Sequence, residues 1–292
     1  MAITAIYHGM VTQITYPLYI SPLSIFSGAG LEFFTITLYE IDPGSGMPRW
    51  RFFTPWAPAA GMMGNLFFIC ALQEKDNRYK AWGIIGSLCL ILMSQSRLAL
   101  ACFLVLFIYF MFVKQLKNPW LYFAGAPIVM LVGFFGTDLI TLIDELTRRF
   151  TAYRAASSRV RSTLADIAIQ RWLNEAPIWG HGVVERGTHL VEYMLIGTHH
   201  TWYGLLFIKG IIGLISFALP LIISFIYFIL NFTVTSLAQT AIAMLILLSL
   251  YSFGENLEIL VYLFWPSMLI IGLAHKEVAQ NNALQNAELT KA

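Results

Sequence analysis

Residues 210–254 contain no Asp, Glu, Lys or Arg, and most of them are large apolar side chains. A membrane-spanning helix needs about 20 consecutive apolar residues, so this run is long enough for two spans, with a break predicted near residues 231–235. Of the whole chain, 58% is hydrophobic and 12% is charged, whereas about a quarter of a soluble domain is charged. Lipid is therefore expected to be the main solvent of this chain.

Further charge-free runs predict further spans, at 52–73, 81–96, 98–113, 118–137 and 259–275. Residues 12–31 are a weaker candidate, because Pro17, Pro22 and several serines dilute the run. These runs are too long and too uniformly apolar for the strands of a membrane β-barrel. We therefore expect an all-α, polytopic bundle of about seven or eight spans, forming one membrane domain over residues 1–292.

The distribution of lysine predicts the orientation of these helices, because short cytoplasmic loops are enriched in Lys and Arg. The predicted cytoplasmic positions are Lys75, Arg78, Lys80, Lys114, Lys117 and a tail at 276–292. Alternation of the spans then places Arg49, Arg51, Arg97 and a large, mainly helical loop at 138–198 outside. Lys209 is the one lysine that falls on the outer side.

The outer loop is unusual because it carries arginine and no lysine. Its arginines are Arg148, Arg149, Arg154, Arg159, Arg161, Arg171 and Arg186. Seven acids in the same loop balance this charge, so most of these arginines are expected to form surface salt bridges of little energetic weight. One or two of them are expected to bind a phosphate or diphosphate, because the planar guanidinium matches phosphate oxygens better than an ammonium does.

Arg97 is a second candidate phosphate ligand, at the predicted outer start of the 98–113 helix and directly after Ser96. A cation at a helix N-terminus opposes the helix dipole unless an anion is nearby. With an anion bound, the arginine, the helix end and the serine hydroxyls would all face it. The alternative is an interfacial arginine that extends to the aqueous surface.

His199 is the candidate catalytic base, because neutral imidazole can accept a proton from a sugar hydroxyl near pH 7. His199 and Gly210 are separated by about three helical turns, so we expect them to share one helix face. The alternative is a polar residue at a span end, with Gly210 permitting close helix packing. The three cysteines lie inside apolar runs and are expected to be core residues, with no metal site.

Several segments together resemble the O-antigen ligase and polymerase superfamily of bacterial membrane glycan-assembly enzymes. The matching pieces are the segment from Arg51 to Pro58, the Ser96-Arg97 pair, Arg159 and Arg161 followed by Pro-Ile-Trp-Gly-His-Gly at 177–182, and His199 with Gly210. Each piece is weakly specific alone, and together they cover about residues 49–214.

The resemblance implies a metal-independent, inverting glycosyltransferase of the GT-C type in the bacterial inner membrane, with no cofactor and an active site facing the periplasm. Its donor would be an undecaprenyl-diphosphate-linked glycan, and its acceptor a glycan, a lipid or a protein; membrane lipids surround it, and no nucleic acid is expected. Arg97, Arg161 and Arg159 would bind the diphosphate and His199 would act as the base. Ser96, His200, Gly210 and Arg51 would support them.

This chain departs from the family pattern in three respects. His200 stands where many members have Asn, and the Ser96-Arg97 pair is followed by Leu-Ala-Leu instead of the small, Gly-rich run of some members. Members also usually have further N-terminal helices. The resemblance thus implies a shortened or truncated member. Polymerase and ligase activities are both compatible with the sequence. A lipid-linked oligosaccharide flippase and a non-catalytic family member are the alternatives, although transporters usually show internal repeats and mid-membrane charges, which this sequence lacks.

Overall fold

The structure is a computed structural model that describes residues 17–26, 30–42, 46–115, 155–191, 193–197 and 200–289, with isolated positions 130, 134, 141 and 145. Its α-helices are α2 (Ala57–Leu72), α3 (Asn77–Met93), α4 (Arg97–Gln115), α7 (Ala155–Glu175), α8 (Thr201–Leu230), α9 (Ser236–Ser252) and α10 (Val261–Leu289). Its strands are β1 (Tyr19–Ile20), β2 (Thr35–Ile41) and β3 (Pro48–Phe52), and its short 3-10 helices are Pro22–Ile25, Leu31–Phe33 and His189–Val191.

The described part of the chain is mostly helical, as the sequence predicted. Helices α2, α3 and α4 overlap three predicted runs, and α8 and α9 divide the 210–254 run at the predicted break. Helix α10 begins in the predicted 259–275 run and continues as helix to Leu289, through most of the predicted tail. Apart from positions 130 and 134, the 118–137 run lies outside the described residues. Within them, α8 alone is long and apolar enough to cross a membrane by length and composition, and Ala57–Leu72, Arg97–Val113 and Ser236–Ser252 are shorter apolar helices. The number of spans therefore remains a prediction.

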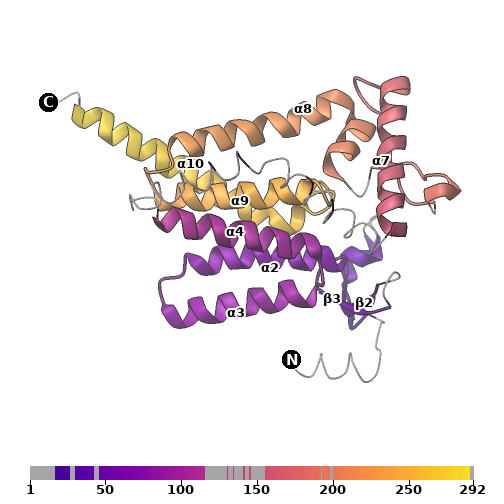
Figure 1. Cartoon of the computed structure of the whole chain (residues 1–292), viewed down its shortest axis with the longest axis horizontal. Coiled ribbons are helices and arrows are strands. Elements are labelled where there is room, and N and C mark those ends of the chain that lie inside the picture. Colours follow the sequence, from indigo (N-terminus) through magenta and orange to yellow (C-terminus); the bar gives the residue numbers. More distant parts are fainter. Residues whose placement is uncertain are drawn as a thin grey trace.

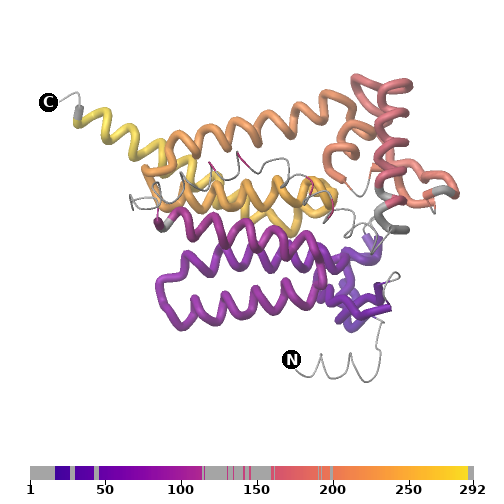
Figure 2. The backbone as a smooth tube through the Cα atoms, viewed as in Figure 1, coloured from indigo at the N-terminus to yellow at the C-terminus, as the bar shows by residue number. Residues whose placement is uncertain are grey.

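Helix α9 lies at the centre of the bundle and packs against α2, α4, α8 and α10. Its residues are buried on all sides, including Met244, Leu247 and Tyr251. The long part of α8 runs beside α9, and α7 crosses the ends of these helices (Figure 1; Figure 2). The outer face of α8 exposes Ile222, Ile223, Ile226 and Ile229, an apolar surface of the kind that faces lipid.

A three-stranded antiparallel sheet, in the order β1-β2-β3, departs from the all-α prediction. Its central strand, Thr-Ile-Thr-Leu-Tyr-Glu-Ile, buries alternate residues, with Thr35, Thr37 and Tyr39 on the inner face. This two-residue period and the β-branched side chains favour a strand over a helix. Residues 17–26 likewise form β1 and a 3-10 turn, so the described part of the weak 12–31 candidate is not a membrane-spanning α-helix.

Helix α8 is broken at Gly210, whose φ of 65° and ψ of −163° lie outside helical values. The break separates an outer segment, 201–209, from the apolar segment 211–230, and the outer segment turns back toward the end of the bundle (Figure 1). The prediction that His199 and Gly210 share one face of a continuous helix is therefore wrong. The helix begins at Thr201, and Gly210 is the point at which its direction changes.

The 177–182 turn supplies the hydrogen bonds that this break leaves open. The amides of His181 and Gly182 donate to the carbonyls of Phe207 and Ile208, both at 2.8 Å. In return, the amides of Ile211 and Ile212 donate to the carbonyls of residues 177 and 178, at 3.0 and 3.4 Å. Unpaired backbone groups are costly at a membrane, so this exchange allows the helix to bend there.

Two glycines make the exchange possible because the backbones touch. A Cβ atom on Gly210 would lie 2.2 Å from the Ile178 carbonyl oxygen, and one on Gly180 would lie 2.5 Å from the Gly210 nitrogen. Both glycines also adopt positive φ angles, 65° and 69°, which other residues rarely tolerate. Gly210 is thus required by the bend rather than by packing between helices.

An ionic network fixes the same turn against α7. Arg171 pairs with Glu175 at 2.7 Å and Glu185 at 2.5 Å, as predicted for most arginines of this loop. The ring of His181 stacks on Phe207 at 4.3 Å, and its nitrogens face Glu175 Oε2 at 2.8 Å and the Phe207 carbonyl at 3.0 Å. Because both oxygens only accept, the two bonds form together only when both ring nitrogens carry protons.

We predict that Gly210→Ala destabilises the fold, because an alanine at this φ costs about 1–3 kcal/mol of strain before any clash is counted. The control is Gly272→Ala on α10, where a Cβ atom would meet nothing within 4 Å. Thermal unfolding of the purified protein in detergent should show a lower Tm for Gly210→Ala only. Equal Tm values for the two variants would contradict the proposed role of the glycine contact.

Acid titration provides a second prediction. Hydrogen bonds from Arg171 and then His181 lower the pKa of Glu175 to about 2. A carboxyl with a lowered pKa stabilises the fold above its ordinary pKa and loses that contribution as the pH falls toward the folded value. In Arg171→Gln, the acid-induced change in tryptophan fluorescence should therefore begin at a higher pH than in the wild type. The control is Arg186→Gln in the same loop, and an unshifted midpoint in Arg171→Gln would refute the assignment.

Candidate functional site

The first turns of α7 carry the predicted phosphate-binding arginines. Arg159 and Arg161 flank Val160, which packs in a small core with Leu164, Val191 and Phe207. The side chain of Arg159 is exposed, and the backbone of Arg161 is helical; the Arg161 side chain lies outside the described residues. Burial of Val160 fixes the rotation of α7, and the two arginines therefore lie on turns that are held in place by packing.

His199 itself lies outside the described residues, but its neighbours are anchored to the loop between α9 and α10. The Thr201 hydroxyl donates to the Glu255 carbonyl at 2.7 Å and accepts from the Leu257 amide at 3.0 Å. On the other side of His199, the side-chain amide of Asn256 donates to the Gly197 carbonyl at 3.2 Å. The segment that contains His199 is thus fixed at both ends to one loop.

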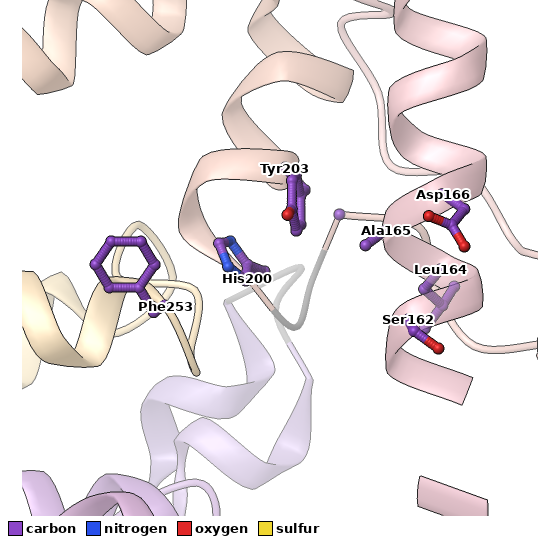
Figure 3. Close-up of a pocket in the computed structure, with 8 residues that line it drawn as sticks. Ser162, Leu164, Ala165, Asp166, His200, Tyr203 and Phe253 are labelled. Atoms are coloured by element: carbon purple, nitrogen blue, oxygen red, sulfur yellow. The ribbon is translucent and has the colours of Figure 1, made fainter. Parts of the chain in front are cut away.

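A cavity of about 330 Å³ lies between α7 and the start of α8 (Figure 3). Its lining residues are Ser162, Leu164, Ala165, Asp166, Gly197, His200, Tyr203 and Phe253. Figure 3 shows His200 and Tyr203 on the α8 side, Ser162 and Asp166 on the α7 side, and Phe253 on the α9 side. The cavity therefore combines aromatic rings with hydroxyl and carboxylate groups.

The arginine-bearing turns of α7 lead directly into this cavity. Ser162 and Asp166 follow Arg159 by three and seven residues, and Ala165 follows Arg161 by four. Residues at these spacings lie on the same side of a helix. The structure thus brings the 159–161 segment and the segment beside His199 to the same cavity.

His200 lies one residue before α8 and is half-buried. Its ring contacts Tyr203 at 4.2 Å and Phe253 at 6.0 Å between centroids, and burial lowers its pKa. Its Nδ1 atom is buried without a hydrogen-bond partner in the part of the chain that the structure describes. A neutral imidazole with a free ring nitrogen can exchange a hydrogen bond with a hydroxyl.

Arg97 begins α4, as predicted, and its side chain is exposed. The two serine hydroxyls before Arg97 form hydrogen bonds at the turn between α3 and α4. Ser96 Oγ accepts from the Ala99 amide at 3.3 Å, and Ser94 Oγ donates to the Ile91 carbonyl at 2.7 Å. These hydroxyls cap the two helix ends, so the expectation that they face an anion is not supported by their described contacts. Gln95, with a φ of 48°, completes the reversal.

Arg51 joins the sheet to the start of α2. Its guanidinium donates to the Pro55 carbonyl at 2.7 Å and to the hydroxyls of Thr35 and Thr37 at 3.0 and 2.9 Å. All three acceptors are neutral, and the arrangement explains the Arg-Phe-Phe-Thr-Pro segment as a structural junction. Trp56, which follows it, donates to Glu255 Oε2 at 3.0 Å and links α2 to the loop that anchors Thr201.

The predicted site residues therefore fall into two groups at one end of the bundle (Figure 1). His200 lines the cavity, and Arg159 and Arg161 lie on the α7 turn just before its lining residue Ser162. Arg51, Ser96 and Arg97 lie around the sheet and the α3–α4 turn. Gly210 lies in neither group and shapes α8. Among the described residues, no group of three or more His, Cys, Asp or Glu side chains could hold a metal ion.

Of the residues that line the cavity, sequence reasoning singled out only His200 for the site. Tyr203 and Asp166 could have been found, because Tyr203 follows His200 by one helical turn and Asp166 follows Arg159 by two. Phe253 carried no such signal, since its position depends on the loop between α9 and α10.

The sequence of this protein was compared with models of known protein families. Residues 82–218 match the family model described as O-antigen ligase. The match extends from α3 to α8 and includes Arg97, Arg159, Arg161, His199 and Gly210. Searches of curated proteins and of solved structures gave no match. The match covers just under half of the chain and supports membership of the O-antigen ligase and polymerase superfamily, whose members are membrane proteins that act in glycan assembly.

Proposed function

We propose that this protein is an inverting glycosyltransferase that transfers a glycan from undecaprenyl diphosphate to an acceptor hydroxyl at the periplasmic face of the bacterial inner membrane. The observation that carries the proposal is the cavity at which the Arg159–Arg161 turn of α7 meets the segment beside His199. The match of residues 82–218 to the O-antigen ligase family model supports the reaction class.

The proposed reaction is a single displacement. The acceptor oxygen forms a bond to the anomeric carbon, the bond from that carbon to the diphosphate oxygen breaks, and His199 takes the acceptor proton. Arg161 and Arg159 stabilise the charge that develops on the leaving diphosphate, so the step requires neither a metal ion nor a covalent intermediate.

The cavity lining suits a sugar ring. The exposed face of Phe253 and the ring of Tyr203 offer apolar surfaces for the C–H face of a sugar, and Asp166 and Ser162 offer hydrogen-bond partners for its hydroxyls. We infer that this cavity binds a sugar of the donor or acceptor glycan beside His199, with the neutral His200 contributing a further hydrogen bond.

Polymerase and ligase activities differ only in the acceptor, which is a second lipid-linked glycan in one case and a lipid or protein in the other. The purified protein, given a defined lipid-linked donor, would yield a longer lipid-linked glycan as a polymerase. Mass spectrometry of the products separates the two activities.

The catalytic assignment predicts that His199→Ala and Arg161→Ala each lower transfer by about 100-fold or more, because a general base and a charge-stabilising group contribute on this scale. Arg186→Ala is the matched control, since Arg186 is an exposed arginine of the same outer region. The measurements are surface glycan in a complementation assay and the amount of inserted protein. Wild-type levels of surface glycan in both His199→Ala and Arg161→Ala would refute the catalytic roles proposed for these two residues.

The sugar-binding cavity predicts that Phe253→Ala raises the KM for the glycan about three- to tenfold with a smaller change in kcat, because an aromatic contact contributes about 0.5–1.5 kcal/mol. Phe112→Ala on α4 is the control; both side chains are more than half exposed, at 62% and 52%, but Phe112 does not line the cavity. A KM unchanged by Phe253→Ala would show that the ring does not contact the glycan.

A further inference from the structure

His181 lies between α7 and the outer segment of α8, and its side chain is only 10% exposed. Its ring stacks on the ring of Phe207, with 4.3 Å between the centroids. Phe207 is fully buried and belongs to the same small core as Leu164 and Ala168 of α7. Figure 1 shows the outer segment of α8 beside that helix. His181 therefore lies at the contact that holds residues 201–209 against α7.

Both ring nitrogens of His181 face oxygen acceptors. Nε2 lies 2.8 Å from Glu175 Oε2, and Nδ1 lies 3.0 Å from the Phe207 carbonyl oxygen. A neutral imidazole has one N–H group and one nitrogen lone pair. In a neutral ring, one nitrogen would therefore turn its lone pair toward one of these two oxygens, and one of the two hydrogen bonds would be lost.

The Phe207 carbonyl lies at the C-terminal end of the outer helical segment, three residues before the break at Gly210. Carbonyls in the last turn of a helix lack an intrahelical partner, and the helix dipole places partial negative charge there. A cationic side chain that bonds these carbonyls is therefore favoured. The end of this segment thus acts together with the Glu175 carboxylate to hold a proton on the His181 ring.

The other charged groups near His181 come from α7 and from the residues after the 177–182 turn. Arg171 pairs with Glu175 and Glu185; from α8 the ring contacts Phe207, and the charged residue of that segment, Lys209, is paired elsewhere. Hydrogen bonds from Arg171 lower the pKa of both glutamates, so both are ionised near neutral pH. Two carboxylates and one guanidinium leave one negative charge, which a protonated His181 cancels.

We propose that His181 is a positioning residue whose protonation holds residues 201–209 against α7 and thereby controls transfer at the site beside His199. His181 does not line the cavity, so it acts through the position of this segment. Loss of its proton would remove one hydrogen bond at the docked end and loosen the segment. The inference rests on the proposed function for the reaction that is controlled.

Two structural links connect His181 to the site. The outer segment 201–209 begins directly after His199 and His200, and His200 lines the cavity. Leu164 of α7 both packs in the core that contains Phe207 and lines the cavity. A displacement of Phe207 from α7 would therefore move both walls relative to each other, and a misplacement of about 1 Å can lower a rate about 100-fold.

The sign of the pH dependence follows from the two bonds. A group that is held in its protonated form by the folded state stabilises that state at low pH and loses this contribution as the pH rises. The segment should therefore be docked most firmly at low pH. His199 has the opposite requirement, because a base must be unprotonated to accept a proton. A comparison of wild type and a His181 variant at each pH cancels the effect of His199, which both contain.

The first test measures glycan transfer by the full chain in nanodiscs, for the wild type and His181→Gln, between about pH 5.5 and 8.5. Glutamine is polar and does not titrate. The ratio of wild-type to variant kcat should fall about tenfold as the pH rises, the scale of one charge-assisted hydrogen bond, with a smaller change in KM. His189→Gln, at an exposed histidine of the same outer region, should give a constant ratio. A constant ratio for His181→Gln would refute the proposal.

The second test needs no substrate. In protein labelled with 15N at histidine, the signals missing from His181→Gln identify the His181 ring, which should lose a proton within this pH range. The amides of Ile211 and Ile212, which donate to the 177–182 turn, should exchange hydrogen more slowly in the wild type than in the variant at low pH. This ratio of exchange rates should approach one as the pH rises. A His181 ring of constant charge, or an exchange ratio that is independent of pH, would overturn the proposal.

Failure of the inference is distinguishable from failure of the proposed function. Exchange that depends on the charge of His181, without glycan transfer by the wild type, would retain the docking role and reject the enzyme. Glycan transfer with a constant kcat ratio would retain the enzyme and reject the role of His181.

Discussion

Backbone hydrogen bonds exchanged between the 177–182 turn and the broken α8 hold the outer end of this bundle together. A helix that bends at a membrane leaves carbonyls and amides unpaired, and such groups are costly away from water. Here the carbonyls of Phe207 and Ile208 and the amides of Ile211 and Ile212 find partners in one turn. Because those bonds are satisfied, residues 201–209 can turn away from the 211–230 segment and lie against α7, and the cavity beside His200 forms between them.

The helices could be predicted from the sequence because lipid makes one property decisive, the length of a charge-free run. The break at 231–235 was predictable for the same reason, since a polar interruption separates two such runs. The sheet was missed because its strands are short and lie between apolar segments, although the alternation in Thr-Ile-Thr-Leu-Tyr-Glu-Ile was present. The bend at Gly210 was also missed, because a glycine within an apolar run gives no sign of the turn that docks on it.

The candidate site was predictable to the extent that its residues are neighbours in sequence. Arg159, Arg161 and His200 were singled out from their segments, and the structure brings those segments together. The place of Phe253 depends on the path of the loop between α9 and α10, which no local pattern reveals. The roles of His199 and Arg161 remain predictions. Arg171 illustrates the opposite case, since its two carboxylate partners assign it to holding the loop.

The position of the 177–182 turn before α8 in the chain has a consequence for assembly in the membrane. Domains and segments made first generally fold first during synthesis, so this turn is available when residues 207–212 emerge. The hydrogen bonds at the bend therefore need no partner made later, whereas the anchor of Thr201 on residues 255–257 does. Gly180 and Gly210 contact each other through backbone atoms. Because neither has a side chain that a smaller one could replace, a substitution at one glycine cannot make room for a larger residue at the other. A suppressor of a substitution at one glycine must therefore arise elsewhere, in the length or path of the loop that joins them.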